Sequence, residues 1–280
     1  MTSRQQGPRV LAHRGASETA AEHTLAAYRA ALDGGADGLE CDVRLTSDGV
    51  PICIHDRRVN RTSNGRGVVS TLELAELAAL DFSASPHGRR RRRREPAPRV
   101  EEVDRDGAGV LTLERLLDVV MEHGSDVELA IETKHPTRYG PSVERRVVSL
   151  LQSRGLDRGP APGRPTVRLM SFSALALSRV KQLAPDLPTV FLVNRLVSPL
   201  AAGYLPAGAD TVGPSIAALR HSPRYVERVH RRGRQVYVWT VNTPEDVEVC
   251  RRAGVDAIIT DRPRAVRAML GQDGVDAADG

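Results

Sequence analysis

Two hydrophobic patterns alternate along most of the chain. Short apolar runs of strand length are followed by stretches in which apolar residues recur at the helical period. Eight strand-like runs lie at Val10–Arg14, Gly38–Arg44 with a continuation at Pro51–His55, Glu128–Lys134, Thr166–Phe172, Pro188–Asn194, Thr211–Ile216, Gln235–Asn242 and Asp256–Asp261. Helical patterns lie between and after them at His23–Leu32, Leu113–His123, Val143–Arg154, Ala174–Leu183, Arg224–Arg231, Pro244–Arg252 and Pro263–Leu270.

Strands that alternate with helices are typical of a parallel sheet. Eight such units in 280 residues favour an α/β fold of the closed (β/α)8 TIM barrel type, which usually needs about 250 residues. A doubly wound open sheet is the structural alternative, because periodicity does not show whether the last strand pairs with the first. We expect one barrel domain over residues 8–270, followed by a flexible tail at 271–280.

The stretch from 56 to 111 interrupts this rhythm after the second strand, and we interpret it as an insertion. Its centre, Ser83–Val103, is rich in Arg, Pro and Glu and is predicted to be partly disordered. Six consecutive arginines, Arg89–Arg94, account for more than the whole formal net charge of +5. The rest of the chain therefore lacks a general basic field, and we expect no nucleic acid partner.

Composition narrows the class further. Hydrophobic residues make up 40% and charged residues 27%, which is near the averages of globular proteins and excludes wholesale disorder. No apolar run approaches the roughly 18 residues of a transmembrane helix, and the opening residues lack the apolar core of a signal peptide. We therefore predict a cytoplasmic protein. Three scattered cysteines, Cys41, Cys53 and Cys250, are interpreted as buried and reduced.

Polar residues interrupt the apolar strands where the strands end, which in a barrel enzyme is the rim that carries the chemistry. Four such places are His13-Arg14-Gly15-Ala16, Glu40-Cys41-Asp42, His55-Asp56 and Glu132-Thr133-Lys134. Alternate side chains of a strand share a face, so Glu40 and Asp42 point one way and Cys41 the other.

Three carboxylates, those of Glu40, Asp42 and Glu132, are thus predicted to meet in one barrel mouth. They would repel one another unless a cation lay among them. Oxygen ligands favour Mg²⁺ or Ca²⁺ over zinc. For any single acid, an ion pair with an arginine of the rim is the alternative.

Other residues of the predicted rim suit phosphate chemistry. His13 and His55 can transfer protons near neutral pH and could face each other across a bound phosphate. Lys134, one of two lysines in the chain, and Arg14 are candidates for binding phosphoryl oxygens. Trp239, the only tryptophan, either walls off a substrate pocket or fills the core. The remaining histidines are predicted to lie on the surface of helices or loops: His23, His87, His123, His135, His221 and His230.

These residues resemble the motif series of the glycerophosphodiester phosphodiesterases, in order and spacing, across nearly the whole chain. The matching motifs are His13-Arg14-Gly15-Ala16, Glu22-His23-Thr24, Glu40-Cys41-Asp42-Val43, Thr46-Ser47-Asp48-Gly49, His55-Asp56, Glu132-Thr133-Lys134 and Trp239-Thr240-Val241-Asn242. The resemblance implies a barrel with an insertion after strand two and a divalent metal held by Glu40, Asp42 and Glu132. It also implies that His13 and His55 are the acid–base pair. The implied products are glycerol 3-phosphate and an alcohol, released from a small glycerophosphodiester.

The chain departs from the family pattern at two places. The family usually reads Pro-Glu-Asn-Thr where this chain has Ala21-Glu22-His23-Thr24, and the arginine tract is not a feature of the family. A phospholipase D-like or phosphoinositide-cleaving barrel is the alternative enzyme, but its expected signs, an exposed apolar rim or a secretion signal, are not visible. A more distant alternative is anion or nucleic acid binding through Arg89–Arg94. The sequence leaves open the head group, the choice of water or a substrate hydroxyl as nucleophile, and the oligomeric state.

Overall fold

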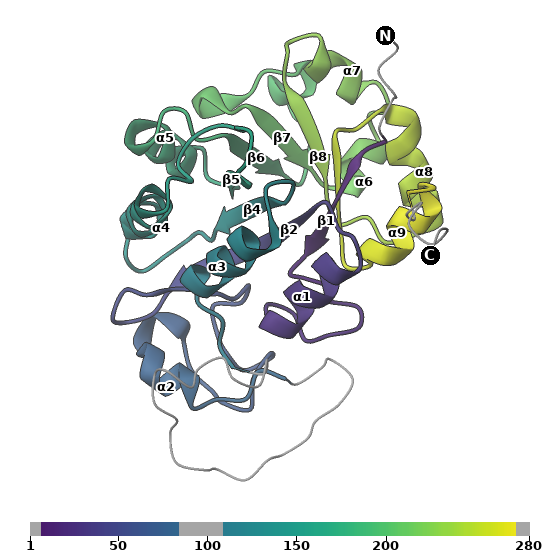
Figure 1. Ribbon diagram of the computed structural model, residues 1–280. Helices are drawn as coiled ribbons and strands as arrows, with labels where there is room; N and C mark the ends of the chain where they lie inside the picture. The colour runs from purple at the N-terminus through teal and green to yellow at the C-terminus, as the bar shows by residue number, and fades with distance from the viewer. Residues whose placement is uncertain (1–6, 84–108, 273–280) are drawn as a thin grey trace.

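The computed structural model of the chain describes residues 7–83 and 109–272, and in this part eight parallel strands form a closed barrel with helices around it (Figure 1). The first strand pairs with both the second and the last, which closes the ring and excludes the open sheet. The predicted TIM barrel is confirmed. Its strands are β1 (Arg9–His13), β2 (Gly38–Leu45), β4 (Glu128–Thr133), β5 (Thr166–Ser171), β6 (Thr189–Val193), β7 (Thr211–Pro214), β8 (Gln235–Val238) and β9 (Ala257–Thr260).

The helices lie outside the barrel and turn their apolar faces toward the strands. Several begin at a Ser or Thr whose side chain accepts a hydrogen bond from the first turn, as Thr24, Thr112 and Thr243 do. The helices are α1 (Leu25–Asp33), α2 (Leu74–Ala78), α3 (Leu113–His123), α4 (Ser142–Ser153), α5 (Ala174–Leu183), α6 (Ile216–Arg220), α7 (Tyr225–His230), α8 (Pro244–Ala253) and α9 (Pro263–Met269). Short 3-10 helices lie at Val69–Thr71, Leu200–Ala202 and Pro206–Gly208.

The two faces of the strands bury different layers. Inward-facing apolar residues fill the barrel, among them Leu11, Met170, Leu192 and Ile259. Outward-facing residues, with Cys41 among them, pack against the helices. All three cysteines are buried and free, as predicted. Among the described residues, no helix is long and apolar enough to cross a bilayer.

Two predicted strands differ from the observed elements. The segment read as a continuation of the second strand, Pro51–His55, is a separate strand β3 (Pro51–Cys53) that pairs antiparallel with β2. A tight turn reverses the chain, in which Thr46 N donates to Val50 O and Gly49 has a φ of 81°. The run predicted as a strand through Ile216 ends at Pro214, and Ser215 caps helix α6.

The described parts of the segment predicted as an insertion lie beside β3 and carry helix α2, which the periodicity did not predict. They form a small apolar cluster of their own with β3, which includes Ile52, Val59, Leu77, Phe82 and Val110. Residues 84–108, with the arginine tract Arg89–Arg94, lie outside the described residues. So does the tail from residue 273 onward.

Candidate functional site

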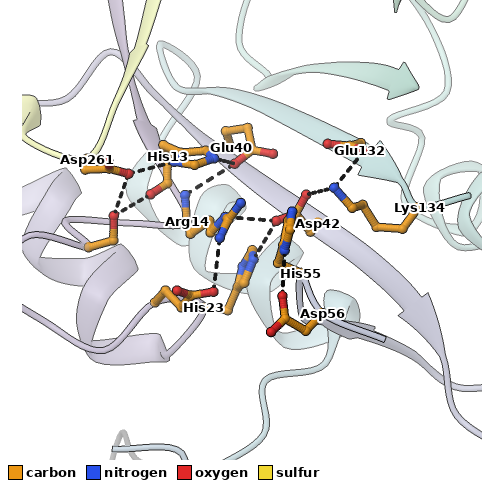
Figure 2. A network of polar contacts seen from close by, with 12 residues as sticks. His13, Arg14, His23, Glu40, Asp42, His55, Asp56, Glu132, Lys134 and Asp261 are labelled. Carbon is orange, nitrogen blue, oxygen red and sulfur yellow. Dashed lines mark hydrogen bonds and ion pairs between the residues drawn. The ribbon is translucent and has the colours of Figure 1, made fainter. Parts of the chain in front are cut away.

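A cavity of about 250 Å³ opens at the C-terminal ends of the barrel strands. One side of it is polar and the other is apolar. The residues that line it are His13, Arg14, Glu40, His55, Glu132, Lys134, Met170, Phe172, Leu192, Trp239, Thr240 and Ile259. Of the eight site residues predicted from the sequence, seven line this cavity, and Asp42 lies directly behind them (Figure 2).

Strand register brings the predicted acids together. His13 on β1 is the register partner of Glu40 on β2, and Asp42 on β2 is the partner of Glu132 on β4. Because partners on adjacent strands point to the same face, all four side chains project into the barrel mouth. Carboxylate oxygens of the three acids lie within 4.8 Å of one another, and all three acids are buried.

The acids of this cluster differ in their ability to hold a charge. Burial, together with the charge of Asp42, raises the pKa of Glu132 to about 8 and that of Glu40 well above its usual range. Burial also opposes the ionisation of Asp42, but the hydrogen bond from His23 and the charges of Arg14 and Lys134 keep its pKa well below the usual range. Two of the three carboxyl groups therefore resist ionisation, and a cation beside them would favour their charged forms.

Two basic side chains contact the cluster directly. Lys134 Nζ lies 3.1 Å from Asp42 Oδ1 and 2.9 Å from Glu132 Oε1. Arg14 Nε lies 3.0 Å from Asp42 Oδ2. Both cations also line the cavity, so they can contact an anion there while they are paired with the acids.

The loop after β1 is shaped to present Arg14. Arg14 has a φ of 60°, in the left-handed region that non-glycine residues seldom adopt. Its neighbour Gly15 has a φ of 85° and lies against helix α1 so closely that a Cβ atom would come 2.6 Å from the carbonyl carbon of Ala27. The glycine of this motif is therefore required by close packing, which fixes the guanidinium beside the acids.

His13 is held by a carboxylate that the sequence reasoning did not single out. Its Nδ1 lies 2.6 Å from Asp261 Oδ1, at the end of β9. Asp261 also accepts hydrogen bonds from Ser17 Oγ at 3.0 Å and from Asn242 Nδ2 at 2.6 Å. Burial opposes its ionisation, but these contacts lower the pKa of Asp261 to about 2. A carboxylate at Nδ1 leaves Nε2 of His13 directed toward the cavity, 3.9 Å from Glu40 Oε2.

His55 is held in a similar way from the other side of the site. Its Nδ1 lies 2.8 Å from Asp56 Oδ1, and Arg61 donates hydrogen bonds to both oxygens of Asp56. Arg61 also binds both carboxylate oxygens of Glu22, at 2.6 and 2.8 Å, and Glu22 accepts from Arg14 at 3.2 Å. Glu22 thus links Arg14 to Arg61, which holds the carboxylate that contacts His55. Burial lowers the pKa of His55.

The prediction that His23 lies on the surface is wrong. Its side chain is buried, with Nε2 3.0 Å from Asp42 Oδ2 and Nδ1 2.8 Å from the hydroxyl of Tyr28. His23 has a φ of 59°, which turns the loop before α1 inward over the acids. A histidine therefore occupies the place of the family's asparagine, and it contacts Asp42 directly. Of the other histidines in this group, His123, His221 and His230 are exposed, His135 is half-buried, and His87 lies outside the described residues.

Trp239 forms the apolar side of the cavity with Phe172. The two rings meet edge to face, with centroids 5.5 Å apart, and the indole Nε1 donates to Gly213 O at 2.7 Å. Trp239 also packs against the apolar core inside the barrel. Trp239 is thus at once a wall of the cavity and the upper limit of the core, and its contact with a substrate stays a prediction.

The acid cluster fits a divalent cation. Mg²⁺ and Ca²⁺ bind oxygen ligands at about 2.0–2.6 Å, so one ion can contact three oxygens that lie within 4.8 Å of one another. Burial and the neighbouring charge of Asp42 raise the pKa values of Glu40 and Glu132, and a cation bound to these acids would oppose both effects. The ligands would be Glu40, Asp42 and Glu132.

The structure adds three residues to the predicted site. Asp261 ends the last strand, so the same strand-end rule that selected Glu132 could have selected it. Phe172 ends the predicted strand Thr166–Phe172 and is 41% exposed, but an apolar residue there carries no polar signal. His23 had a signal in the motif Glu22-His23-Thr24, but the helical pattern His23–Leu32 does not show that the loop before the helix folds inward.

Comparisons with known proteins agree with this geometry. The model of the Glycerophosphoryl diester phosphodiesterase family matches residues 13–265. A probable glycerophosphodiester phosphodiesterase 1 of Mycobacterium tuberculosis is 42% identical over 267 residues, which cover 95% of this chain and 93% of that protein. A glycerophosphodiester phosphodiesterase of Caldanaerobacter subterraneus is 31% identical over 270 residues, with 95% and 98% covered.

The fold has counterparts among solved structures. One is an Oleispira antarctica phosphodiesterase in complex with the product sn-glycerol-3-phosphate. It superposes with a TM-score of 0.78 at 23% sequence identity, and the match covers 94% of this chain and 97% of that one. At this identity, the likeness supports the barrel architecture.

Proposed function

Since the chain belongs to the glycerophosphoryl diester phosphodiesterase family, we propose that it hydrolyses small glycerophosphodiesters to glycerol 3-phosphate and an alcohol, with a divalent metal ion and two histidines. The product bound to the Oleispira antarctica enzyme is the one expected from this reaction. The barrel domain proposed to carry it spans residues 8–270. Free, buried cysteines suit a reducing compartment, and the cytoplasm is the proposed location, which cell fractionation tests.

The observation that carries the proposal is a cluster of three carboxylates, two of which line the same cavity as two histidines. Glu40, Asp42 and Glu132 would hold Mg²⁺ or Ca²⁺, which supplies positive charge against phosphoryl oxygens. Arg14 and Lys134 line the same cavity and stabilise negative charge on the phosphoryl group. The apolar surface of Trp239 covers the carbon skeleton of the glycerol.

His13 and His55 are the proposed acid and base. Each has a carboxylate at Nδ1, so each presents Nε2 as the nitrogen that accepts or donates a proton. One activates the nucleophile, and the other protonates the leaving alkoxide, which is a poor leaving group without a proton. The nucleophile is either water or the neighbouring glycerol hydroxyl, and the second route passes through a cyclic phosphate.

Product analysis tests the reaction itself. Purified protein is incubated with a panel of glycerophosphodiesters, with and without chelator, and products are followed by phosphorus NMR. We expect glycerol 3-phosphate only when Mg²⁺ or Ca²⁺ is present. A cyclic intermediate, together with an inert deoxy analogue, would identify attack by the hydroxyl. Full turnover after exhaustive metal removal would disprove the metal requirement.

Single substitutions test the histidines. His13→Ala and His55→Ala should each lower kcat by roughly 10²–10⁴-fold. A substrate with a nitrophenol leaving group needs no general acid, so it should restore the rate of only one of the two variants. If it restores neither or both, the acid and base roles are not divided between these residues.

A further inference from the structure

A second pocket lies beside the catalytic cavity and is bordered by four cationic side chains. These are Arg44, Arg57, Lys134 and Arg138. The polar neighbours are the residues Ser70 and Thr137, and the pocket contains no acid in its lining. Such a set of donors is suited to an anion.

The three arginines of this pocket have no acidic partner within the part of the chain that the structure describes. Arg44 Nε donates to the backbone oxygen of His55 at 2.9 Å, and Arg138 lies over the ring of Tyr139. Two other arginines near the site are paired, Arg14 with Asp42 and Arg61 with Asp56. The pocket therefore combines three arginines that have no carboxylate partner among the described residues with Lys134, which is paired with Asp42 and Glu132.

Nearby acids do not pair with the arginines of this pocket. The carboxylates that act on Arg44 are those of Asp42, Glu132 and Asp56. Each is already engaged: the first two by Lys134 and the third by Arg61. An anion in the pocket would thus gain attraction from cations that have capacity left.

The pocket adjoins the catalytic cavity and shares one lining residue with it. Lys134 lines both spaces, and the backbone of His55 is bonded to Arg44. In Figure 2, Lys134 and Glu132 lie on one side of the site, and His13 and Asp261 lie on the other. A substrate phosphate bound between the histidines would therefore have the basic pocket beside it.

We propose that this pocket binds a second anionic group, a phosphomonoester or a carboxylate, carried by the alcohol that leaves. The preferred substrates are then glycerophosphodiesters whose leaving alcohol is itself negatively charged. The enclosed part of the pocket is only about 20 Å³, so the anion binds at its mouth, where Arg57 and Arg138 are exposed. This inference rests on the proposed function, because it assigns a substrate class to that site.

The test compares two substrates that differ only in the anionic group, glycerophosphoinositol and glycerophosphoinositol 4-phosphate. The wild-type protein should have a kcat/KM about tenfold higher for the 4-phosphate. In Arg57→Gln/Arg138→Gln, the ratio should fall to near one while kcat/KM for glycerophosphoinositol, whose leaving alcohol is uncharged, stays within about twofold. The control Arg29→Gln/Arg264→Gln removes two exposed arginines from α1 and α9, so it changes the net charge equally and should keep the preference.

A binding measurement separates failure of this inference from failure of the proposed reaction. Inositol 4-phosphate, the anionic leaving alcohol, is titrated calorimetrically into wild type and the double variant, with inorganic phosphate as the second probe. Wild type should bind inositol 4-phosphate more tightly than inorganic phosphate, and Arg57→Gln/Arg138→Gln should lose this difference. That result supports an anion site in the pocket even if neither diester is cleaved. Three outcomes would each overturn the substrate assignment. Wild type could have equal kcat/KM values for the two diesters, or the double variant could keep the preference. Wild type could also bind inorganic phosphate as tightly as inositol 4-phosphate.

Discussion

Both ends of the barrel interior bury charged side chains, but the two ends differ in the balance of charge. At the N-terminal end, Glu128 is fully buried between two arginines, with Oε2 2.8 Å from Arg9 NH1 and Oε1 2.9 Å from Arg168 Nε. The hydroxyl of Tyr237 donates to the same carboxylate at 3.2 Å. One acid there has two cations and an additional donor.

At the C-terminal end, three acids share two cations. Asp42 takes contacts from Arg14, His23 and Lys134, whereas Glu132 has only Lys134, which it shares. Burial, together with the charge of Asp42, raises the pKa of Glu132 to about 8. Satisfied charge at one end stabilises the closed barrel, and unsatisfied charge at the other end is available to a ligand.

The largest expected effect comes from removing a carboxylate at the C-terminal end. Glu132→Gln should lower kcat/KM by roughly a thousandfold, since it removes a ligand of the proposed metal, while the melting temperature stays the same or rises. Steady-state kinetics measures kcat/KM, and scanning calorimetry measures the melting temperature. An active Glu132→Gln protein with a normal metal requirement would exclude this residue from the metal site.

Replacing the buried acid at the N-terminal end of the barrel tests the other half of the comparison. Glu128→Ala removes the carboxylate partner of the buried Arg168 and one partner of the partly exposed Arg9, so the free energy of unfolding should fall by about 3–5 kcal/mol. The kcat of the folded protein should change little. Glu227→Ala, which breaks an exposed pair with Arg231, is the matched control and should cost about 0.5 kcal/mol or less. Urea unfolding measures both, and equal losses would contradict the contrast between the ends.

A smaller effect on kcat is expected when Asp261, the carboxylate that holds His13, is replaced. Asp261→Asn keeps the shape of the side chain but no longer favours the proton on Nδ1, so kcat should fall about a hundredfold with KM nearly unchanged. Ser17→Ala removes only one donor to Asp261 and should cost a few-fold at most. Histidine NMR of the ring nitrogens gives a separate measurement, because the tautomer of His13 should change in Asp261→Asn. An unchanged tautomer would show that Asp261 does not orient the ring.

The same carboxylate predicts a dependence of stability on pH. The folded-state pKa of Asp261 is about 2, below the usual 3.8. Its contribution to stability is therefore present above pH 3.8 and is lost as the pH falls toward 2, and it amounts to about 2 kcal/mol. Unfolding free energies of wild type and Asp261→Asn should converge in this range. A constant difference down to the lowest measurable pH would rule out this cause.

The smallest effect is expected from the arginine tract. Deleting Arg89–Arg94 should leave turnover of a small substrate within a few-fold, because the tract lies in a Pro- and charge-rich stretch outside the barrel rhythm. Lost activity with an intact circular dichroism spectrum would show that the tract shapes the site.

Much of this molecule could be predicted from the sequence because its signals are local. Strand periodicity predicted the eight parallel strands, and the bounds of Leu113–His123 and Ala174–Leu183 agree with α3 and α5. Alternation along β2 predicted that Glu40 and Asp42 face one way and Cys41 the other. The motif series resembled the family to which the chain belongs.

The sequence by itself determined the alternating strands and helices, the family and the residue types of the site, because each follows from periodicity or from motifs within a few residues. Only the tertiary structure decided which groups touch. Asp261 lies 248 residues from His13 along the chain, and closure of β9 against β1 brings them together. His23 reaches Asp42 because its loop folds inward, and Arg44, Arg57 and Arg138 meet because β3 returns beside β2. Contacts between distant segments depend on how the strands close and the loops pack, which local patterns do not encode.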